Sequence, residues 1–214
     1  MSDSNFPLMG KWLNSKNSIH CPLDHDGIKL QGEDPDNPNA DDTILEQCLT
    51  EYTWAYGGFL EKRKLYERSA HFKEDNNFRN IHLGLDIWGE TYQKIYAPFE
   101  LEIHSFTNND KHGDYGPTVI FKGNEAFPYI LCGHLTTANL ELWESKKFYR
   151  KGEIIGHFGS RVENGGWYPH VHLQVMRDME NYQGDYPGVW AESKINRMQD
   201  NLVNPIDLVY LEME

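Results

Sequence analysis

Apolar and polar positions after residue 79 follow the pattern of short β-strands. Apolar residues alternate with polar ones, or run on without interruption, over six short segments that Gly and Pro separate. Segments of this length and pattern are typical of strands. The sequence therefore predicts strands at Ile81–Trp88, Ile95–Phe106, Thr118–Lys122, Tyr129–Leu135, Ile154–Phe158 and Val171–Met176. We expect a mainly β domain at residues 79–176, built as an antiparallel sheet or sandwich.

The residues on either side of this domain show other patterns. Residues 1–43 are rich in Asn, Asp, Pro and Gly, which predicts solvated loops. Apolar residues then recur at helical spacing, at Leu45, Leu49, Tyr52 and Tyr56. A second short helix is expected within 59–71. We expect residues 1–78 to form a loop-and-helix extension that packs on the β domain, because it is too short for its own core. Residues 177–214 predict a tail with a short helix near Trp190–Met198.

The composition is that of a folded globular protein. Of the 214 residues, 39% are hydrophobic, and the formal net charge is −13. This negative charge disfavours a nucleic-acid-binding protein, which normally presents a basic face. No apolar run approaches the roughly 18 residues that span a bilayer, and no signal peptide is visible after Met1. The odd number of cysteines, Cys21, Cys48 and Cys132, predicts reduced thiols in a cytoplasmic protein.

A His and an Asp form the first candidate site, at His82-x-Gly84-x-Asp86. Side chains alternate along a strand, so His82 and Asp86 would share one face. An imidazole and a carboxylate on one face are suitable zinc ligands. By itself this pair is a weak signal, because a surface His near a surface Asp is common.

Three more histidines accompany apolar strand residues. His170 and His172 would point to one face of a strand, with Val171 and Leu173 on the other. One such histidine can bind a metal while its neighbour donates a hydrogen bond, although two exposed histidines would give the same pattern. His134 ends another apolar strand. Three protein ligands with one open position are the arrangement of a catalytic rather than a structural zinc site.

The order and spacing of these motifs resemble the lysostaphin-like zinc endopeptidases. The resemblance covers about residues 79–176 and includes His82-x-Gly84-x-Asp86, Tyr96-Ala97-Pro98, Gly133-His134-Leu135, Lys151-Gly152-Glu153-Ile154-Ile155-Gly156-His157-Phe158-Gly159 and Pro169-His170-Val171-His172-Leu173. It implies a sheet of the lysostaphin-like type, with Zn²⁺ bound by His82, Asp86 and His172. It also implies that His134 and His170 are catalytic.

The implied activity is hydrolysis of a peptide bond through a zinc-activated water. The resemblance favours peptidoglycan fragments as substrate, whereas the charge and the expected cytoplasmic location favour a small peptide. The segments 56–61 and 108–116 look like a cytoplasmic-type branch of the family. No glutamate base of the H-E-x-x-H type is present, so histidine must take that role.

Two other functions fit the same residues. A regulatory domain that binds metal without cleaving anything would need the three ligands but not His134 and His170. A zinc-dependent amidase acting on a non-peptide substrate would share the metal chemistry, and sequence cannot separate it from a peptidase. The remaining histidines of the β domain, His104, His112 and His157, are expected to be surface or packing residues.

Overall fold

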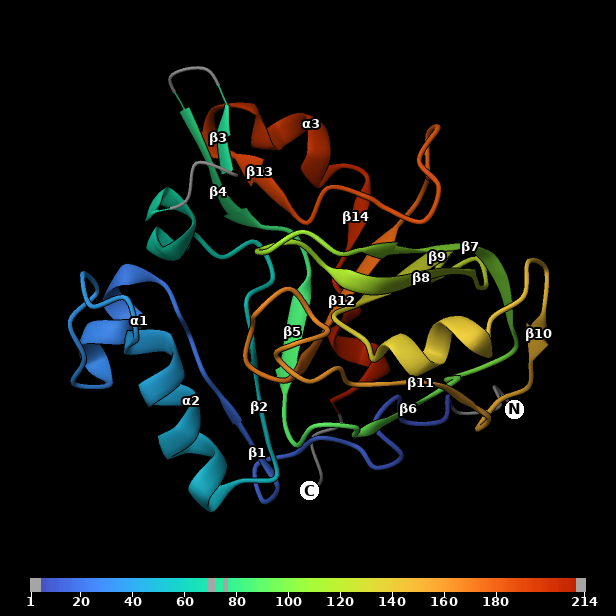
Figure 1. Cartoon of the computed structure of the whole chain (residues 1–214), viewed down its shortest axis with the longest axis horizontal. Helices are drawn as coiled ribbons and strands as arrows, with labels where there is room; N and C mark the ends of the chain where they lie inside the picture. Colours follow the sequence, from blue (N-terminus) through green and yellow to red (C-terminus); the bar gives the residue numbers. More distant parts are fainter. Residues whose placement is uncertain (1–4, 69–71, 75–76, 211–214) are drawn as a thin grey trace.

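A nine-stranded sheet forms the centre of the computed structural model, which describes residues 5–68, 72–74 and 77–210. Its strands lie in the order β1 (Ser18–His20), β2 (Trp54–Gly57), β5 (Leu85–Trp88), β12 (His170–Met176), β9 (Tyr129–Gly133), β8 (Gly116–Lys122), β7 (Leu101–Asn109) and β10 (Phe148–Tyr149), with β14 (Leu202–Val203) on β12 (Figure 1). Neighbouring strands are antiparallel except for β1 and β2, which are parallel. The prediction of a mainly β protein is confirmed.

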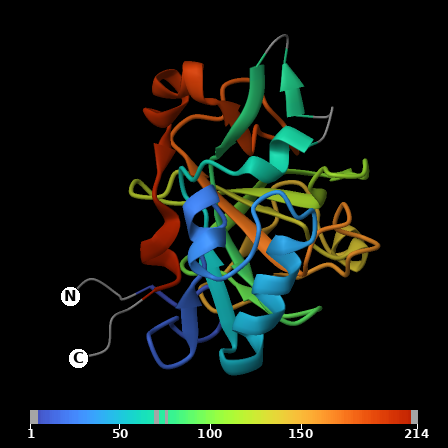
Figure 2. The same cartoon turned by 90° about the vertical axis from the view of Figure 1, so that its left-hand side faces the viewer.

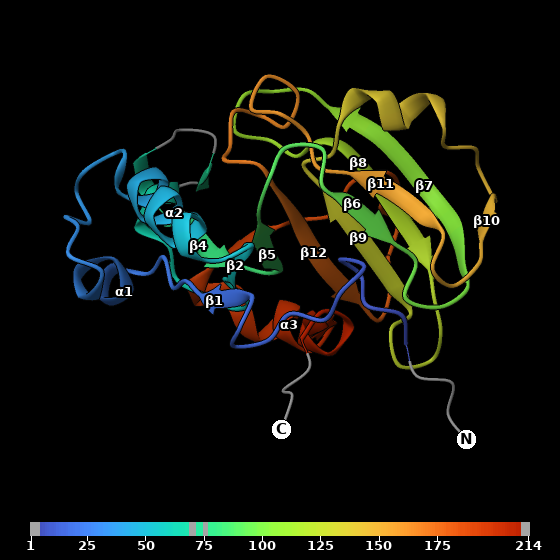
Figure 3. The same cartoon turned by 90° about the horizontal axis from the view of Figure 1, so that it is seen from below.

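Two smaller sheets cover the main one. β6 (Lys94–Tyr96) pairs with β11 (Ile154–His157), and Figure 3 shows this pair lying over β7, β8 and β9. Ile95 and Ile155 of the pair pack in the largest core cluster with Val119 and Phe121 of β8. The other sheet contains β3 (Lys73–Glu74), β4 (Asn77–His82) and β13 (Val189–Ala191), and lies with α3 (Ile195–Gln199) at the top of Figure 1.

Strand β12 is buried on both faces, and this explains its sequence. Val171, Leu173 and Val175 enter the largest core cluster, as the alternation predicts. His170 and His172 lie on the opposite face, and they too are buried. A polar face that is nevertheless covered needs partners for its polar atoms, so this face is where a site is expected.

Helices α1 (His25–Leu30) and α2 (Ala40–Glu51) lie on one side of the main sheet, the side that faces the viewer in Figure 2. The helical spacing of Leu45 and Leu49 is explained by α2, but the extension of that helix to Tyr56 was wrong. Tyr52 is already extended, with φ −117° and ψ 150°, and Tyr56 lies on β2 opposite Ile87. Pairing between distant strands overrides local helical spacing here.

The helix predicted within 59–71 was also wrong for its first half. The chain from Glu61 to Arg63 runs beside β4, where Arg63 donates its amide hydrogen to Asn80 O at 2.9 Å and Glu61 O accepts that of His82 at 2.8 Å. A short 3₁₀ helix, η1 (Lys64–Arg68), follows. Residues 69–71 of the predicted helix lie outside the described residues.

Two predicted strands are each divided in the structure. The segment Ile81–Trp88 forms the end of β4 and the whole of β5, because the chain passes from one sheet to another at Gly84. The segment Ile95–Phe106 forms β6 and the first part of β7. Pro98 lies at that break and has no amide hydrogen for a ladder.

The tail combines strand and helix. The helix predicted near Trp190–Met198 is present as η4 (Glu192–Lys194) and α3, and only its first two residues differ, because Trp190 and Ala191 lie on β13 beside β4. Two further 3₁₀ helices are η3 (Thr137–Glu141) and η5 (Pro205–Leu208). Every helix within the described ranges is too short or too polar to cross a bilayer.

Candidate metal centre

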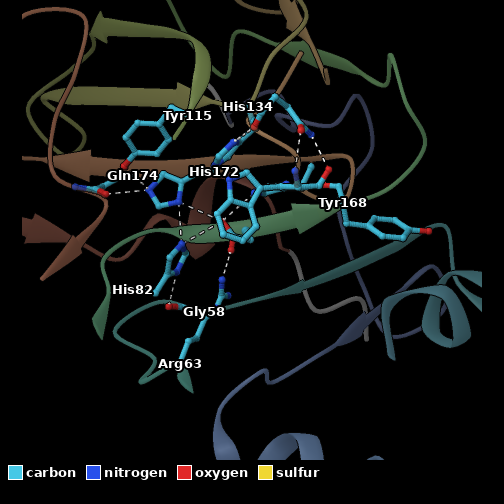
Figure 4. Close-up of polar contacts among 12 residues, drawn as sticks. Gly58, Arg63, His82, Tyr115, His134, Tyr168, His172 and Gln174 are labelled. Carbon is cyan, nitrogen blue, oxygen red and sulfur yellow. Dashed lines mark hydrogen bonds and ion pairs between the residues drawn. The ribbon is translucent and has the colours of Figure 1, made fainter. Parts of the chain in front are cut away.

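His82, Asp86 and His172 converge where β4, β5 and β12 meet, and Figure 4 shows the two histidines pointing toward each other. His82 Nε2 lies 2.8 Å from His172 Nδ1 and 3.3 Å from Asp86 Oδ1. The distance from His172 Nδ1 to Asp86 Oδ1 is 3.2 Å. All three side chains are buried. The structure thus brings together the three residues that the resemblance marks as zinc ligands.

The donor set fits a zinc ion. Imidazole nitrogen and carboxylate oxygen bind zinc at about 2.0–2.2 Å, so the ligand atoms of a tetrahedral site lie roughly 3.3–3.5 Å apart. The two distances to Asp86 Oδ1 agree with this spacing, and the two histidine nitrogens are somewhat closer. Three buried lone-pair atoms pointing at one another are costly without a cation between them.

Hydrogen bonds on the far side of each imidazole orient the two histidines. His82 Nδ1 lies 2.8 Å from Gly58 O, which leaves the lone pair on Nε2. His172 Nε2 lies 3.0 Å from Gln174 Oε1 and 3.3 Å from the Tyr115 hydroxyl, which leaves the lone pair on Nδ1. Such partners fix the tautomer of metal-binding histidines.

Two glycines make room for these rings. A Cβ at Gly84 would lie 2.6 Å from the ring of His172. The missing side chain of Gly84 therefore leaves the space that the ring of His172 occupies. Gly58 has a φ of +102°, which favours glycine, and a Cβ there would lie 2.7 Å from His82 Nδ1.

Asp86 has an ionic partner on the side away from the histidines. Arg63 Nη1 donates to Asp86 Oδ2 at 2.6 Å, and Arg63 Nε donates to Glu61 Oε2 at 2.7 Å. Burial alone would raise the pKa of Asp86, but His82 and Arg63 hold that pKa well below its usual range. Asp86 is therefore a carboxylate at neutral pH, as a metal ligand must be.

The two histidines implied as catalytic lie beside this cluster. Their ring centroids are 4.2 Å apart, and His170 Nε2 is 3.8 Å from Asp86 Oδ1. His134 Nδ1 lies 2.8 Å from Asn164 O, and His170 Nδ1 lies 2.6 Å from Tyr168 O. Burial lowers the pKa of His170 to about 4 and that of His134 well below its usual range. Both are neutral near pH 7 and carry the Nε2 lone pair.

The three candidate ligands and the two histidines beside them line one cavity of about 370 Å³: His82, Asp86, His172, His134 and His170. Tyr66, Phe72 and Trp167 form an aromatic part of its wall, and Asp42 and Leu45 of α2 form another part. His104, His112 and His157 do not line this cavity. The first 78 residues therefore supply part of the wall around the candidate site.

Sequence reasoning missed the residues that support the ligands, which are Gly58, Glu61, Arg63, Tyr115 and Gln174. Gln174 had a signal, because it continues the alternation of His170 and His172 on β12. No pattern in the sequence indicated Arg63, because Arg63 and Asp86 belong to segments that are far apart along the chain.

Neither the models of protein families nor the curated proteins match this chain. Solved structures that are similar include the catalytic domain of the antimicrobial peptidase lysostaphin from Staphylococcus simulans, at 16% identity and a TM-score of 0.39, over 59% of this chain and 77% of that one. A mutant catalytic domain of the prophage-encoded protein EnpA from Enterococcus faecalis is 18% identical, with a TM-score of 0.40, over 62% and 82% of the two chains. A zinc containing peptidase from Vibrio cholerae is 14% identical, with a TM-score of 0.40, over 63% of this chain and 32% of that one.

Proposed function

We propose that this protein is a zinc-dependent metallopeptidase that hydrolyses a peptide bond. The observation that carries the proposal is the convergence of three buried ligand atoms with two buried, neutral histidines in one cavity. A regulatory metal site needs the ligands but has no use for His134 and His170. The order of the motifs along the sequence supports the same reading.

His82, Asp86 and His172 would hold the zinc, and a zinc bound there would supply a Lewis acid for the carbonyl group and for the water. His134 and His170 move the protons. Each has Nδ1 against a backbone carbonyl, which leaves its Nε2 free to accept a proton, and one of the two takes the single proton that the water loses as it attacks. The imidazolium formed in this way then donates that proton to the leaving amine.

The substrate that we propose is a small peptide or a peptidoglycan fragment. A cavity of about 370 Å³ lies within the range of roughly 300–1,000 Å³ that holds small ligands. α2 and η1 contribute Leu45 and Tyr66 to its wall and so narrow the approach to the ligands. This arrangement suits a short chain better than an assembled polymer.

A reducing, cytoplasmic compartment is part of the proposal. The Sγ atoms of Cys21 and Cys48 are 3.8 Å apart, yet both cysteines are free, as is Cys132. Thiols this close can oxidise to a disulfide outside a reducing compartment, so the redox state of Cys21 and Cys48 tests this part of the proposal.

The test combines metal analysis with a substrate panel. We expect one zinc per chain in the parent protein, and little or none in His172→Ala. His157→Ala is the matched control, because His157 lies outside the cavity. The panel contains glycine-rich peptides, peptides with D-amino acids, soluble wall fragments, intact sacculi and non-peptide amides.

Each outcome of this test separates the candidate functions. Zinc with hydrolysis of peptides or wall fragments supports the proposal. Zinc without any hydrolysis identifies a regulatory metal domain, and cleavage of non-peptide amides alone identifies an amidase. Retention of zinc by His172→Ala contradicts the ligand assignment.

A further inference from the structure

The two carboxylate oxygens of Asp86 have different partners. Oδ1 faces the histidine cluster, at 3.3 Å from His82 Nε2 and 3.2 Å from His172 Nδ1. Oδ2 instead accepts a hydrogen bond from Arg63 Nη1 at 2.6 Å. The side chains of Asp86 and Arg63 are only 3% and 4% exposed, so water does not replace this contact.

Arg63 is held in turn by Glu61. The 2.7 Å contact between Arg63 Nε and Glu61 Oε2 is partly buried, and Glu61 Oε1 accepts the amide hydrogen of Leu23 at 2.9 Å. Arg63 also lies over the ring of Trp88, with Cζ 5.6 Å from the ring centroid. The guanidinium reaches the two carboxylates from two separate nitrogens, Nη1 and Nε, whereas a lysine has a single nitrogen for both contacts.

The backbone around Arg63 is shaped for this arrangement. A Cβ at Gly58 would lie 2.2 Å from Arg63 Nη2, so only glycine leaves room for the guanidinium. The carbonyl of the same glycine accepts from His82 Nδ1. The segment 58–63 thus contacts two of the three ligand side chains, although it lies outside the motifs at 79–176.

From these contacts we propose that Arg63 and Glu61 are positioning residues of the metal centre. Arg63 occupies Oδ2, so only Oδ1 of Asp86 would be available to a metal beside the two histidines. Glu61 offsets the positive charge of Arg63, which would otherwise weaken Asp86 as a donor. This inference rests on the proposed zinc function.

The two substitutions should differ in their effect on zinc affinity, because only the loss of Glu61 should weaken it. Arg63→Met removes a cation near the metal and frees Oδ2, so zinc binds as tightly as in the parent or more tightly. Glu61→Gln keeps the shape of the side chain but leaves the full charge of Arg63 on Asp86, so zinc binds on the order of 10-fold more weakly. A residue that merely stabilised the fold would weaken zinc binding in both variants.

The geometry of the site should change only in the arginine variant. Co²⁺ in place of zinc reports coordination number, since four-coordinate Co²⁺ absorbs visible light more strongly than five-coordinate Co²⁺. We expect weaker absorption in Arg63→Met, because both oxygens of Asp86 become available. Activity on the best substrate of the panel should fall about 10–100-fold in the same variant, and Arg63→Lys should recover part of it.

The experiment uses the full chain and measures zinc affinity by chelator competition, the Co²⁺ spectrum and activity. Lys62→Met is the matched control, because Lys62 lies in the same segment but is exposed and pairs with Glu192. If Arg63→Met does not fold, Glu61→Gln carries the test alone. Parental zinc affinity in Glu61→Gln, or an unchanged Co²⁺ spectrum in a folded Arg63→Met, overturns the inference and leaves the proposed function intact. A parent chain that binds no zinc overturns both.

Discussion

Gly84 provides a direct test of how closely the candidate metal centre is packed. A methyl group in Gly84→Ala would lie 2.6 Å from Cε1 and Nε2 of His172 and 2.8 Å from the carbonyl oxygen of Leu173. Ordinary contacts begin at 3.4 Å, so a neighbour must move by about 0.8 Å. The Leu173 carbonyl is fixed within β12, next to β5. The ring of His172 is therefore the group that moves.

Two magnitudes follow from this displacement. Overpacking of this kind costs about 1–3 kcal/mol of folding stability, which lowers Tm without unfolding the protein. A shift of about 0.8 Å exceeds the tolerance of roughly 0.2 Å for a metal–ligand distance. We therefore expect Gly84→Ala to bind zinc about 10–100-fold more weakly than the parent. Chelator competition measures the affinity, and calorimetry measures Tm.

Gly156→Ala is the matched control. Its Cβ would meet Leu135 Cδ1 at 3.2 Å and Asn139 Nδ2 at 3.4 Å, so it crowds β11 without touching a ligand. It should lower Tm modestly and keep the parental zinc affinity. If Gly84→Ala binds zinc as tightly as the parent while folded, His172 does not hold the metal in the orientation described, and the reasoning is refuted.

Three further predictions concern protons and thiols. His134→Ala and His170→Ala should each keep zinc but lower kcat on the order of 10²-fold, because each removes a proton carrier; a parental rate in either variant removes that residue from the mechanism. The metal-free protein should lose stability as pH falls from about 6.5 toward 4. Burial lowers the pKa of His82 and His170 to about 4, so the unfolded chain, with histidine pKa values of about 6.5, takes up protons that the folded chain does not. Each such histidine lowers the free energy of unfolding by at most about 1.4 kcal/mol for each unit by which the pH falls. A Tm that stays constant over this window would contradict the account. Finally, alkylation of unfolded, unreduced protein from the source cells should label three thiols, and a Cys21–Cys48 disulfide would argue against a reducing compartment.

Much of the sheet could be predicted because its strands carry their pattern locally. β12 alternates apolar and polar residues, and each side chain of Val171, Leu173 and Val175 enters the core as expected. Strand ends were harder. The break at Gly84 could not be seen, because Leu83 and Leu85 are both apolar and buried although they belong to different core clusters. Alternation does not reveal a change of sheet.

The same limit applies to the candidate site. His82 and Asp86 were expected to share one strand face, and the structure does bring them together, but from two strands. The closeness of Asp86 and His172 depends on β5 pairing with β12, which places the two residues opposite each other. The alternation of side chains along a strand predicts the face on which a residue lies, but it does not predict which strand pairs with that strand. The order of the motifs along the sequence indicated that these residues meet at one site, whereas the composition did not.

The segment 58–63 contacts the candidate metal ligands, so the functional unit extends beyond the motifs. The motifs lie within 79–176, yet the carbonyl of Gly58 orients His82, and Arg63 binds Asp86. A fragment limited to those motifs would leave Asp86 Oδ2 without its buried cation, and loss of such a partner is strongly destabilising. β2 would also be lost from its place beside β5, exposing the strand that carries Asp86. We therefore propose that the described part of residues 1–78 forms an integral wall of the metal centre rather than a separate appendage.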